Sequence, residues 1–98
     1  MVYLIVYDIS VNSIRNKVAK ILIKESFERL QLSVFLGNED PTKNYKLWQQ
    51  LTNLIKDDKE AKFYVFPLPD TSLKNMQYIG QSNIDIVYLL GEKDSFFI

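Results

Sequence analysis

Residues 1–10, MVYLIVYDIS, constrain the fold more than any other stretch of this chain. The run is rich in β-branched and aromatic side chains and is broken by a single carboxylate, Asp8. Continuous apolar runs of this length are typical of a central strand that is buried on both faces. Asp8 would then stand at the carboxyl end of the strand, where ligand sites gather in open α/β sheets.

The chain has 98 residues, of which 47% are hydrophobic and 13% are aromatic. This length and composition predict one folded domain, residues 1–98, whose core is small enough to benefit from a partner subunit. No apolar run is as long as a membrane span, and the apolar opening lacks the basic leader of a signal peptide. We therefore expect a soluble cytoplasmic protein with no membrane partner.

Cysteine and histidine are both absent, and this absence excludes more chemistry than any other feature of the composition. Disulfides, thiol nucleophiles, imidazole bases and the usual zinc sites all require one of these residues. A metal would have to be held by oxygen ligands, which favours Mg²⁺ or Mn²⁺, with Ca²⁺ as a further option. Any hydrolysis would depend on metal and carboxylate.

Charge is unevenly distributed, although the formal net charge is zero. Residues 1–56 hold eight Lys and Arg against five Asp and Glu, whereas residues 57–98 hold four against seven. The first part of the chain is therefore the better candidate for contact with phosphate.

A helix is predicted from a polar cluster of N-cap candidates, Ser10, Asn12 and Ser13, to about Glu25. Its apolar face is formed by Ile14, Val18, Ile21 and Leu22. The opposite side carries Lys17, Lys20 and Lys24, which form either an ordinary solvated face or a phosphate contact. Arg15 lies in the first turn, from which it could reach a phosphate held beside Asp8.

Residues 29–37 alternate in the manner of a strand. One side carries Leu30, Leu32, Val34 and Leu36, and the other carries Arg29, Gln31, Ser33 and Phe35. Three polar residues followed by a large aromatic favour contact with a specific partner, although a half-exposed strand would show the same pattern.

The second half predicts one more helix and two more strands. Asp40 and Pro41 mark a helix start, and Leu47, Leu51, Leu54 and Ile55 form its apolar face. We expect a strand at residues 61–67, a loop or short irregular segment at 70–83, a last strand at 84–90 and an apolar tail at 95–98. The acids Asp57 and Asp58 are interpreted as a solvated turn.

This order of elements is typical of an α+β, ferredoxin-like βαββαβ sandwich with an extra C-terminal strand, if residues 29–37 bend into two strands. Helices cover only one face of such a sheet. Because the first strand is apolar on both faces, we expect a homodimer that buries the other face, with residues 84–98 packing on the partner.

Two separated motifs resemble a known family: residues 6–9 (VYDI) with residues 15–17 (RNK), and residues 31–37 (QLSVFLG). The Phe66-Pro67-Leu68 strand end agrees with them. The chain resembles CRISPR-associated protein two, the small dimeric subunit of the spacer-acquisition machinery. Members are described as metal-dependent endonucleases for single-stranded RNA or duplex DNA, and as non-catalytic bridges between dimers of the integrase, CRISPR-associated protein one.

The resemblance implies that two Asp8 residues face each other across a two-fold cleft and bind Mg²⁺ or Mn²⁺ as the catalytic centre. Without the resemblance, capping of the following helix or turn would be the favoured role for Asp8. The implied nucleic-acid-binding residues are Tyr7, Arg15, Lys17, Arg29, Ser33 and Phe35.

Three departures from the family pattern concern substrate contact. Leu32 replaces a common Tyr, Val11 replaces a usually acidic or polar residue, and Lys17 stands where some relatives have Arg. A toxin-like ribonuclease, virulence-associated protein D, shares the fold and the early Tyr-Asp and is a competing interpretation. A ferredoxin-like module for a small ligand is a lower alternative, because the chain has no Gly-rich phosphate loop.

Overall fold

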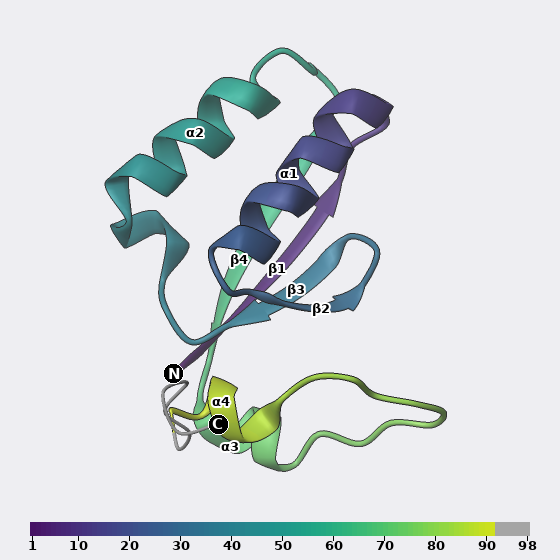
Figure 1. Ribbon diagram of the computed structural model, residues 1–98, viewed down its shortest axis with the longest axis vertical. Helices are drawn as coiled ribbons and strands as arrows, with labels where there is room; N and C mark the ends of the chain where they lie inside the picture. The colour runs from purple at the N-terminus through teal and green to yellow at the C-terminus, as the bar shows by residue number, and fades with distance from the viewer. Residues whose placement is uncertain (92–98) are drawn as a thin grey trace.

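The computed structural model describes residues 1–91. Four strands form one antiparallel sheet in the order β2-β3-β1-β4 (Figure 1). The elements are β1 Val2–Asp8, α1 Asn12–Lys24, β2 Glu28–Gln31, β3 Val34–Gly37, the 3-10 helix η1 Pro41–Lys43, α2 Tyr45–Ile55, β4 Lys62–Leu68, α3 Asp70–Lys74 and α4 Ile86–Leu89. Residues 2–68 therefore have the predicted βαββαβ order.

Strand β1 is central, as its unbroken apolar run predicts. It pairs with β3 on one side and along its whole length with β4 on the other. Ile5 lies between Phe35 of β3 and Val65 of β4 and is fully buried. The sheet is thus built outward from β1, the stretch of sequence that most constrains the fold.

Helices α1 and α2 cover one face of the sheet (Figure 1). Val18 and Leu22 of α1 and Leu47 and Leu51 of α2 are buried in the same core as Ile5, which confirms both predicted helical faces. Asp40 and Pro41 mark a helix start as expected, but of the short η1, whereas α2 begins at Tyr45 and is capped by Asn44. The polar N-cap predicted for α1 is wrong, because α1 begins after Val11 and has no side-chain cap.

Residues 29–37 form a hairpin, which is the bent alternative for this stretch. Arg29 pairs with Phe35 across β2 and β3, so these two side chains share a face as predicted. That face is the helix side, and Phe35 is fully buried in the core. Phe35 therefore does not face a partner, whereas Leu32, at the turn, is 78% exposed.

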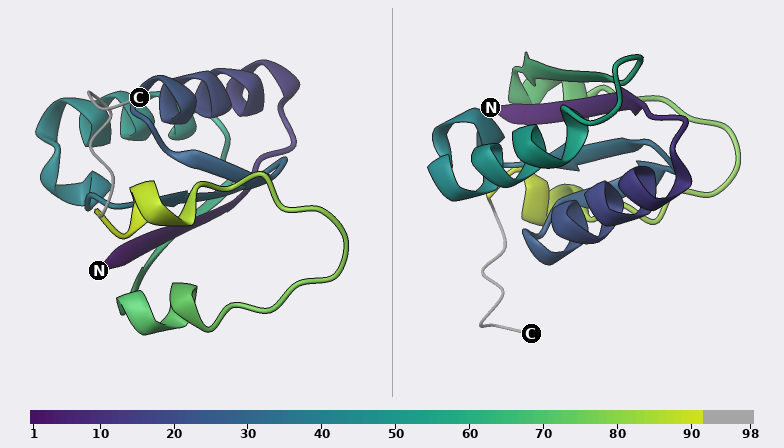
Figure 2. Two further views of the ribbon diagram at one scale, coloured as in Figure 1. Left: turned by 60° about the horizontal axis from the view of Figure 1, so that its bottom comes forward. Right: turned by 90° about the horizontal axis from the view of Figure 1, so that it is seen from above.

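The predicted last strand, residues 84–90, is wrong. Within this stretch only α4 is regular, and the structure shows α3 and α4 on the side of the sheet opposite α1 and α2 (Figure 2). Leu89 and Leu73 are buried there with Val2 and Leu36. The apolar residues of this stretch obtain burial against their own sheet, and the strand-like composition does not decide their conformation.

The C-terminal segment covers only part of this second face. Residues 75–83 arc away from the sheet between α3 and α4 (Figure 2). Tyr64 and Phe66 of β4 remain 49% and 46% exposed. The predicted tail, residues 95–98, lies outside the described residues. Within residues 1–91, no helix is long and apolar enough to cross a membrane.

Candidate nucleic-acid and metal site

Tyr7 and Asp8 end β1 and point to opposite faces of the sheet, because side chains alternate along a strand. Tyr7 faces the helices and is only 3% exposed, and it belongs to the core under α1 and α2. Asp8 is exposed. The two residues implied most strongly by the family resemblance therefore occupy different environments within one chain.

The Tyr7 ring is held between two other aromatic rings. Its centroid lies 6.1 Å from that of Phe35 and 5.9 Å from that of Phe63, and both pairs are stacked. The Tyr7 hydroxyl donates a hydrogen bond to the backbone oxygen of Leu32 at 3.4 Å. This contact joins the end of β1 to the turn of the β2–β3 hairpin.

Burial raises the pKa of the Tyr7 phenol above its ordinary value. The positive charges of Arg29 and Arg15, and a hydrogen bond with the Ser33 side chain, offset part of this rise in pKa. The phenol is therefore a neutral hydrogen-bond donor at physiological pH. The charges of Arg15 and Arg29 therefore both act on the Tyr7 phenol, and Ser33 is also bonded to Tyr7 through the backbone, where the Tyr7 N–H donates to the Ser33 oxygen at 3.1 Å.

Arg29 is fixed at the hairpin by three contacts. Its Nε and Nη2 donate to the Leu32 oxygen at 3.2 and 2.7 Å, and its guanidinium carbon lies 5.4 Å from the centre of the Phe35 ring. The Leu32 backbone oxygen thus accepts from both Arg29 and Tyr7. A guanidinium held in this way is an ordered cation on an exposed hairpin.

Arg15 ties the start of α1 to the end of β1. Its Nη1 donates to the backbone oxygen of Ile9 at 3.3 Å, and its Nη2 donates to the Asn12 side chain. The sequence predicts only a capping role for Asn12 and gives no signal of its bond to Arg15. We name Tyr7, Arg15, Arg29 and Ser33, supported by buried Phe35, the cationic cluster.

Lys17 is exposed on α1. No hydrogen bond or ion pair joins Lys17 to the cationic cluster in the part of the chain that the structure describes. A shallow hollow lined by residues 29–34 lies beside the cluster on the hairpin. The ordered cations therefore come from the first turn of α1 and from β2, and Lys17 is a separate positive charge.

The donor chemistry around Asp8 agrees with a hard cation, but one chain provides only part of a site. An exposed carboxylate is an oxygen ligand of the kind that Mg²⁺ and Mn²⁺ prefer. Residues 1–91 contain no group of three or more Asp, Glu, His or Cys residues that could hold a metal ion. A divalent cation at Asp8 would therefore need ligands from a second chain, from water or from substrate.

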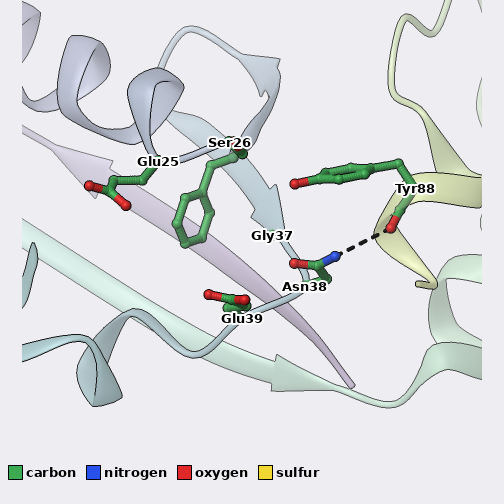
Figure 3. A pocket seen from close by; sticks show the side chains of 7 residues that line it. Glu25, Ser26, Gly37, Asn38, Glu39 and Tyr88 are labelled. Carbon is green, nitrogen blue, oxygen red and sulfur yellow. Dashed lines mark hydrogen bonds between the residues drawn. The ribbon is translucent and has the colours of Figure 1, made fainter. Parts of the chain in front are cut away.

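A second pocket, of about 160 Å³, lies where the C-terminal segment meets the rest of the fold. Figure 3 shows Glu25 and Glu39 in this pocket and the hydrogen bond from the Asn38 side chain to the Tyr88 backbone oxygen, 3.3 Å long. Two carboxylates would repel phosphate. This pocket is therefore a poor candidate for nucleic-acid binding.

The fold and the end of β1 define a small α+β protein with a cationic cluster on one face and an exposed carboxylate on the other. This chain belongs to the Cas2 family: the family model for CRISPR associated protein Cas2 matches residues 1–76. The family implied by the two sequence motifs is thereby confirmed.

Two similar proteins are named CRISPR-associated endoribonuclease Cas2 1. The protein from Archaeoglobus fulgidus is 31% identical over 89% of this chain and 92% of its own length. The protein from Chloroflexus aurantiacus is 36% identical over 82% of this chain and 85% of its own length.

Two solved structures share the fold. Streptococcus pyogenes Cas2 has a TM-score of 0.65 at 21% identity and covers 82% of this chain and 100% of its own. A hypothetical protein from Thermus thermophilus has a TM-score of 0.63 at 25% identity and covers 85% of this chain and 94% of its own.

Proposed function

We propose that this chain is a divalent-metal-dependent endonuclease of the spacer-acquisition stage of CRISPR immunity. Its substrate class is single-stranded RNA or duplex DNA, and Asp8 is the metal ligand of the catalytic centre. The observation that carries the proposal is the exposed Asp8 carboxylate at the end of the buried central strand. The endoribonuclease names of the two relatives support the same activity.

The proposed active form is a homodimer. Asp8 shares its face of the sheet with Val6, Val34, Tyr64 and Phe66, and this area is only partly buried in one chain. Stacking two such areas across a two-fold axis would bury apolar surface and bring two Asp8 carboxylates together. Two carboxylates repel each other, and a divalent cation between them relieves that repulsion.

Asp8 and its two-fold copy would hold the cation, with water and phosphate oxygens as the other ligands. When bound, Mg²⁺ or Mn²⁺ supplies an activated water and stabilises negative charge on the phosphate. The chain has no histidine to serve as a general base. The proposed role of its own residues is therefore to hold the metal and to bind and orient the nucleic acid, and not to act as an imidazole base.

The cationic cluster and Lys17 are proposed to contact the nucleic-acid backbone. Arg15 and Arg29 already use some of their donors within the fold, so their guanidinium groups are ordered before substrate arrives. This preorganisation lowers the entropy cost of binding. Phe35 is fully buried, so its proposed role is to support Arg29 and not to stack on a base.

A second candidate function is an architectural subunit that binds DNA and bridges dimers of the CRISPR integrase without cutting. The ordered guanidinium groups of Arg15 and Arg29 favour this alternative, because they can contact a phosphate backbone without a metal. It uses the same dimer and the same cationic cluster. Membership of the Cas2 family leaves the virulence-associated protein D interpretation without support.

The deciding experiment compares Asp8→Asn with the wild-type chain and with Asp57→Asn, an exposed carboxylate in a turn. The amide keeps the shape of Asp8 and removes the charge that would hold the cation. We expect wild type and Asp57→Asn to cut RNA or DNA only with Mg²⁺ or Mn²⁺ and to stop with chelator, while Asp8→Asn stays at background.

Sedimentation of the same three proteins tests the dimer, which Asp8→Asn should retain. Full nuclease activity in a rigorously purified Asp8→Asn protein would contradict the site. An inactive wild type that still binds DNA and integrase would favour the architectural function. A stable monomer at micromolar concentration would contradict both forms of the proposal.

A further inference from the structure

Lys62 lies directly across from Asp8 on the neighbouring strand. The antiparallel pairing of β1 with β4 runs in continuous register from Val2 opposite Leu68 to Asp8 opposite Lys62. Residues that are opposite each other in this way point to the same face, with Cβ atoms about 5 Å apart. Lys62 is therefore the cation that the register places beside Asp8.

Both side chains are available for interaction. Asp8 and Lys62 are exposed, and neither is joined to another side chain by a hydrogen bond or ion pair within residues 1–91. Arg15 and Arg29, in contrast, are bonded to backbone oxygens. The long flexible stem of Lys62 lets its ammonium group approach either the carboxylate or a ligand bound there.

The surroundings of this pair are apolar. The next pair on this face of the two strands is Val6 opposite Tyr64, and Val34 lies on the other side of Val6. Covering this area would exclude water from the neighbourhood of Asp8 and Lys62. Charges interact more strongly when water is displaced from around them.

We propose that Lys62 is the counter-ion of Asp8 and thereby sets how tightly this site binds a divalent cation. The inference rests on the proposed role of Asp8 as metal ligand. In the free protein, the positive charge of the Lys62 ammonium group lies near the Asp8 carboxylate without a direct ion pair within residues 1–91, and it opposes the binding of a divalent cation there. Lys62 is thus a positioning residue of the metal site, since it acts through Asp8.

Nucleic acid should change this balance. A phosphate at the site offers Lys62 an alternative anion, and the ammonium can then leave Asp8 free to bind the metal. Metal and nucleic acid would consequently each raise the affinity for the other, by the same factor. Lys62 would restrict tight metal binding to the complex with nucleic acid.

The test measures Mn²⁺ binding to the full chain by electron paramagnetic resonance or calorimetry, without nucleic acid. The variants are Lys62→Gln, Lys62→Arg, Asp8→Asn and a matched control, Lys20→Gln, which removes one positive charge from the exposed side of α1. At a spacing of about 5 Å, the Coulomb repulsion between the Lys62 ammonium and Mn²⁺ weakens metal binding. Its removal in Lys62→Gln is expected to tighten Mn²⁺ binding about three- to tenfold.

Lys62→Arg should resemble wild type, since it keeps the charge, and Lys20→Gln should leave the Mn²⁺ affinity unchanged. Unchanged or weaker Mn²⁺ binding by Lys62→Gln would overturn the inference while leaving Asp8 as the ligand. If Asp8→Asn binds Mn²⁺ as well as wild type does, the proposed metal site fails and the Lys62 inference fails with it.

A second measurement repeats the titration with a short single-stranded RNA present. RNA should tighten Mn²⁺ binding more in wild type than in Lys62→Gln. Wild type has an ammonium group that can move from Asp8 to an RNA phosphate, and the Gln variant has none. Equal tightening in both proteins would overturn the coupling role of Lys62.

Discussion

Gly37→Ala tests the packing that holds the hairpin against α1. Gly37 ends β3 and is buried, and the Phe27 ring lies against its Cα. A Cβ at Gly37 would lie 2.3 Å from Cε2 and 2.4 Å from Cδ2 of Phe27. Separations this short cannot be tolerated, so the ring would have to move within the core.

The expected cost follows from two opposing terms. Overpacking a core by one methyl group typically costs about 1–3 kcal/mol, as side chains leave their preferred rotamers. Replacing glycine by alanine returns about 0.4–1 kcal/mol through the lower entropy of the unfolded chain. The net expectation is a loss of about 1–2 kcal/mol in the free energy of unfolding, or a fall in Tm of about 5–10 °C for a chain of this size.

Urea and thermal unfolding of Gly37→Ala, Phe27→Leu and the double variant would measure this cost. Phe27→Leu should destabilise alone, because it removes a buried ring. The smaller side chain should leave room for the methyl group added at position 37, so the double variant should be more stable than the sum of the single effects predicts. A Gly37→Ala protein more stable than wild type, or strict additivity, would refute the steric reasoning.

Three further predictions concern other parts of the fold. Ser26 has a positive φ of 69° after α1, so Ser26→Gly should raise the free energy of unfolding by about 0.5–1 kcal/mol in urea unfolding, and a loss would contradict it. Leu89→Ala should cost about 2–5 kcal/mol if the C-terminal segment packs as described, whereas exposed Leu32→Ala should stay within about 0.5 kcal/mol; equal effects in thermal unfolding would argue against that packing. Burial raises the pKa of Tyr7, so the unfolded phenol ionises at a lower pH than the folded one. The free energy of unfolding of wild type relative to Tyr7→Phe should therefore be constant below about pH 10 and fall as the pH rises towards the raised pKa. A difference that stays unchanged in alkaline unfolding would contradict this expectation.

Most of residues 1–68 could be predicted because local signals and burial agree there. The apolar run of β1 and the spacing of Val18 with Leu22 and of Leu47 with Leu51 lead to the observed central strand and helical faces. The start of α1 could not be predicted from polar residues alone. Its first turn is stabilised by the Arg15 bonds and not by a capping side chain.

The hairpin shows why alternation alone does not assign a buried face. Leu30 and Leu32 follow the same alternation as Leu36, yet they are 40% and 78% exposed while Leu36 is buried. The register shift between Arg29 and Gln31 breaks the simple pattern. A bulge of this kind depends on strand pairing, which a single segment of sequence does not specify.

The C-terminal segment is the largest error, and its cause is tertiary. Residues 84–90 have a strand-like composition, and Asp85 lies where its side chain accepts a hydrogen bond from the Tyr88 N–H and caps α4. Burial of Leu89 against Val2 and Leu36 offsets the β preference. Composition could indicate that this segment needs apolar cover, but not which surface provides it.

The opposite directions of Tyr7 and Asp8 have a consequence for any reaction at this site. Adjacent residues of one strand cannot both contact one phosphate from the same face of the sheet. If Asp8 holds a metal against the scissile phosphate, the cationic cluster must bind the nucleic acid elsewhere along its backbone or act in the other subunit. Substitutions in the cluster should then weaken binding without changing metal dependence, whereas Asp8 and Lys62 should control metal dependence.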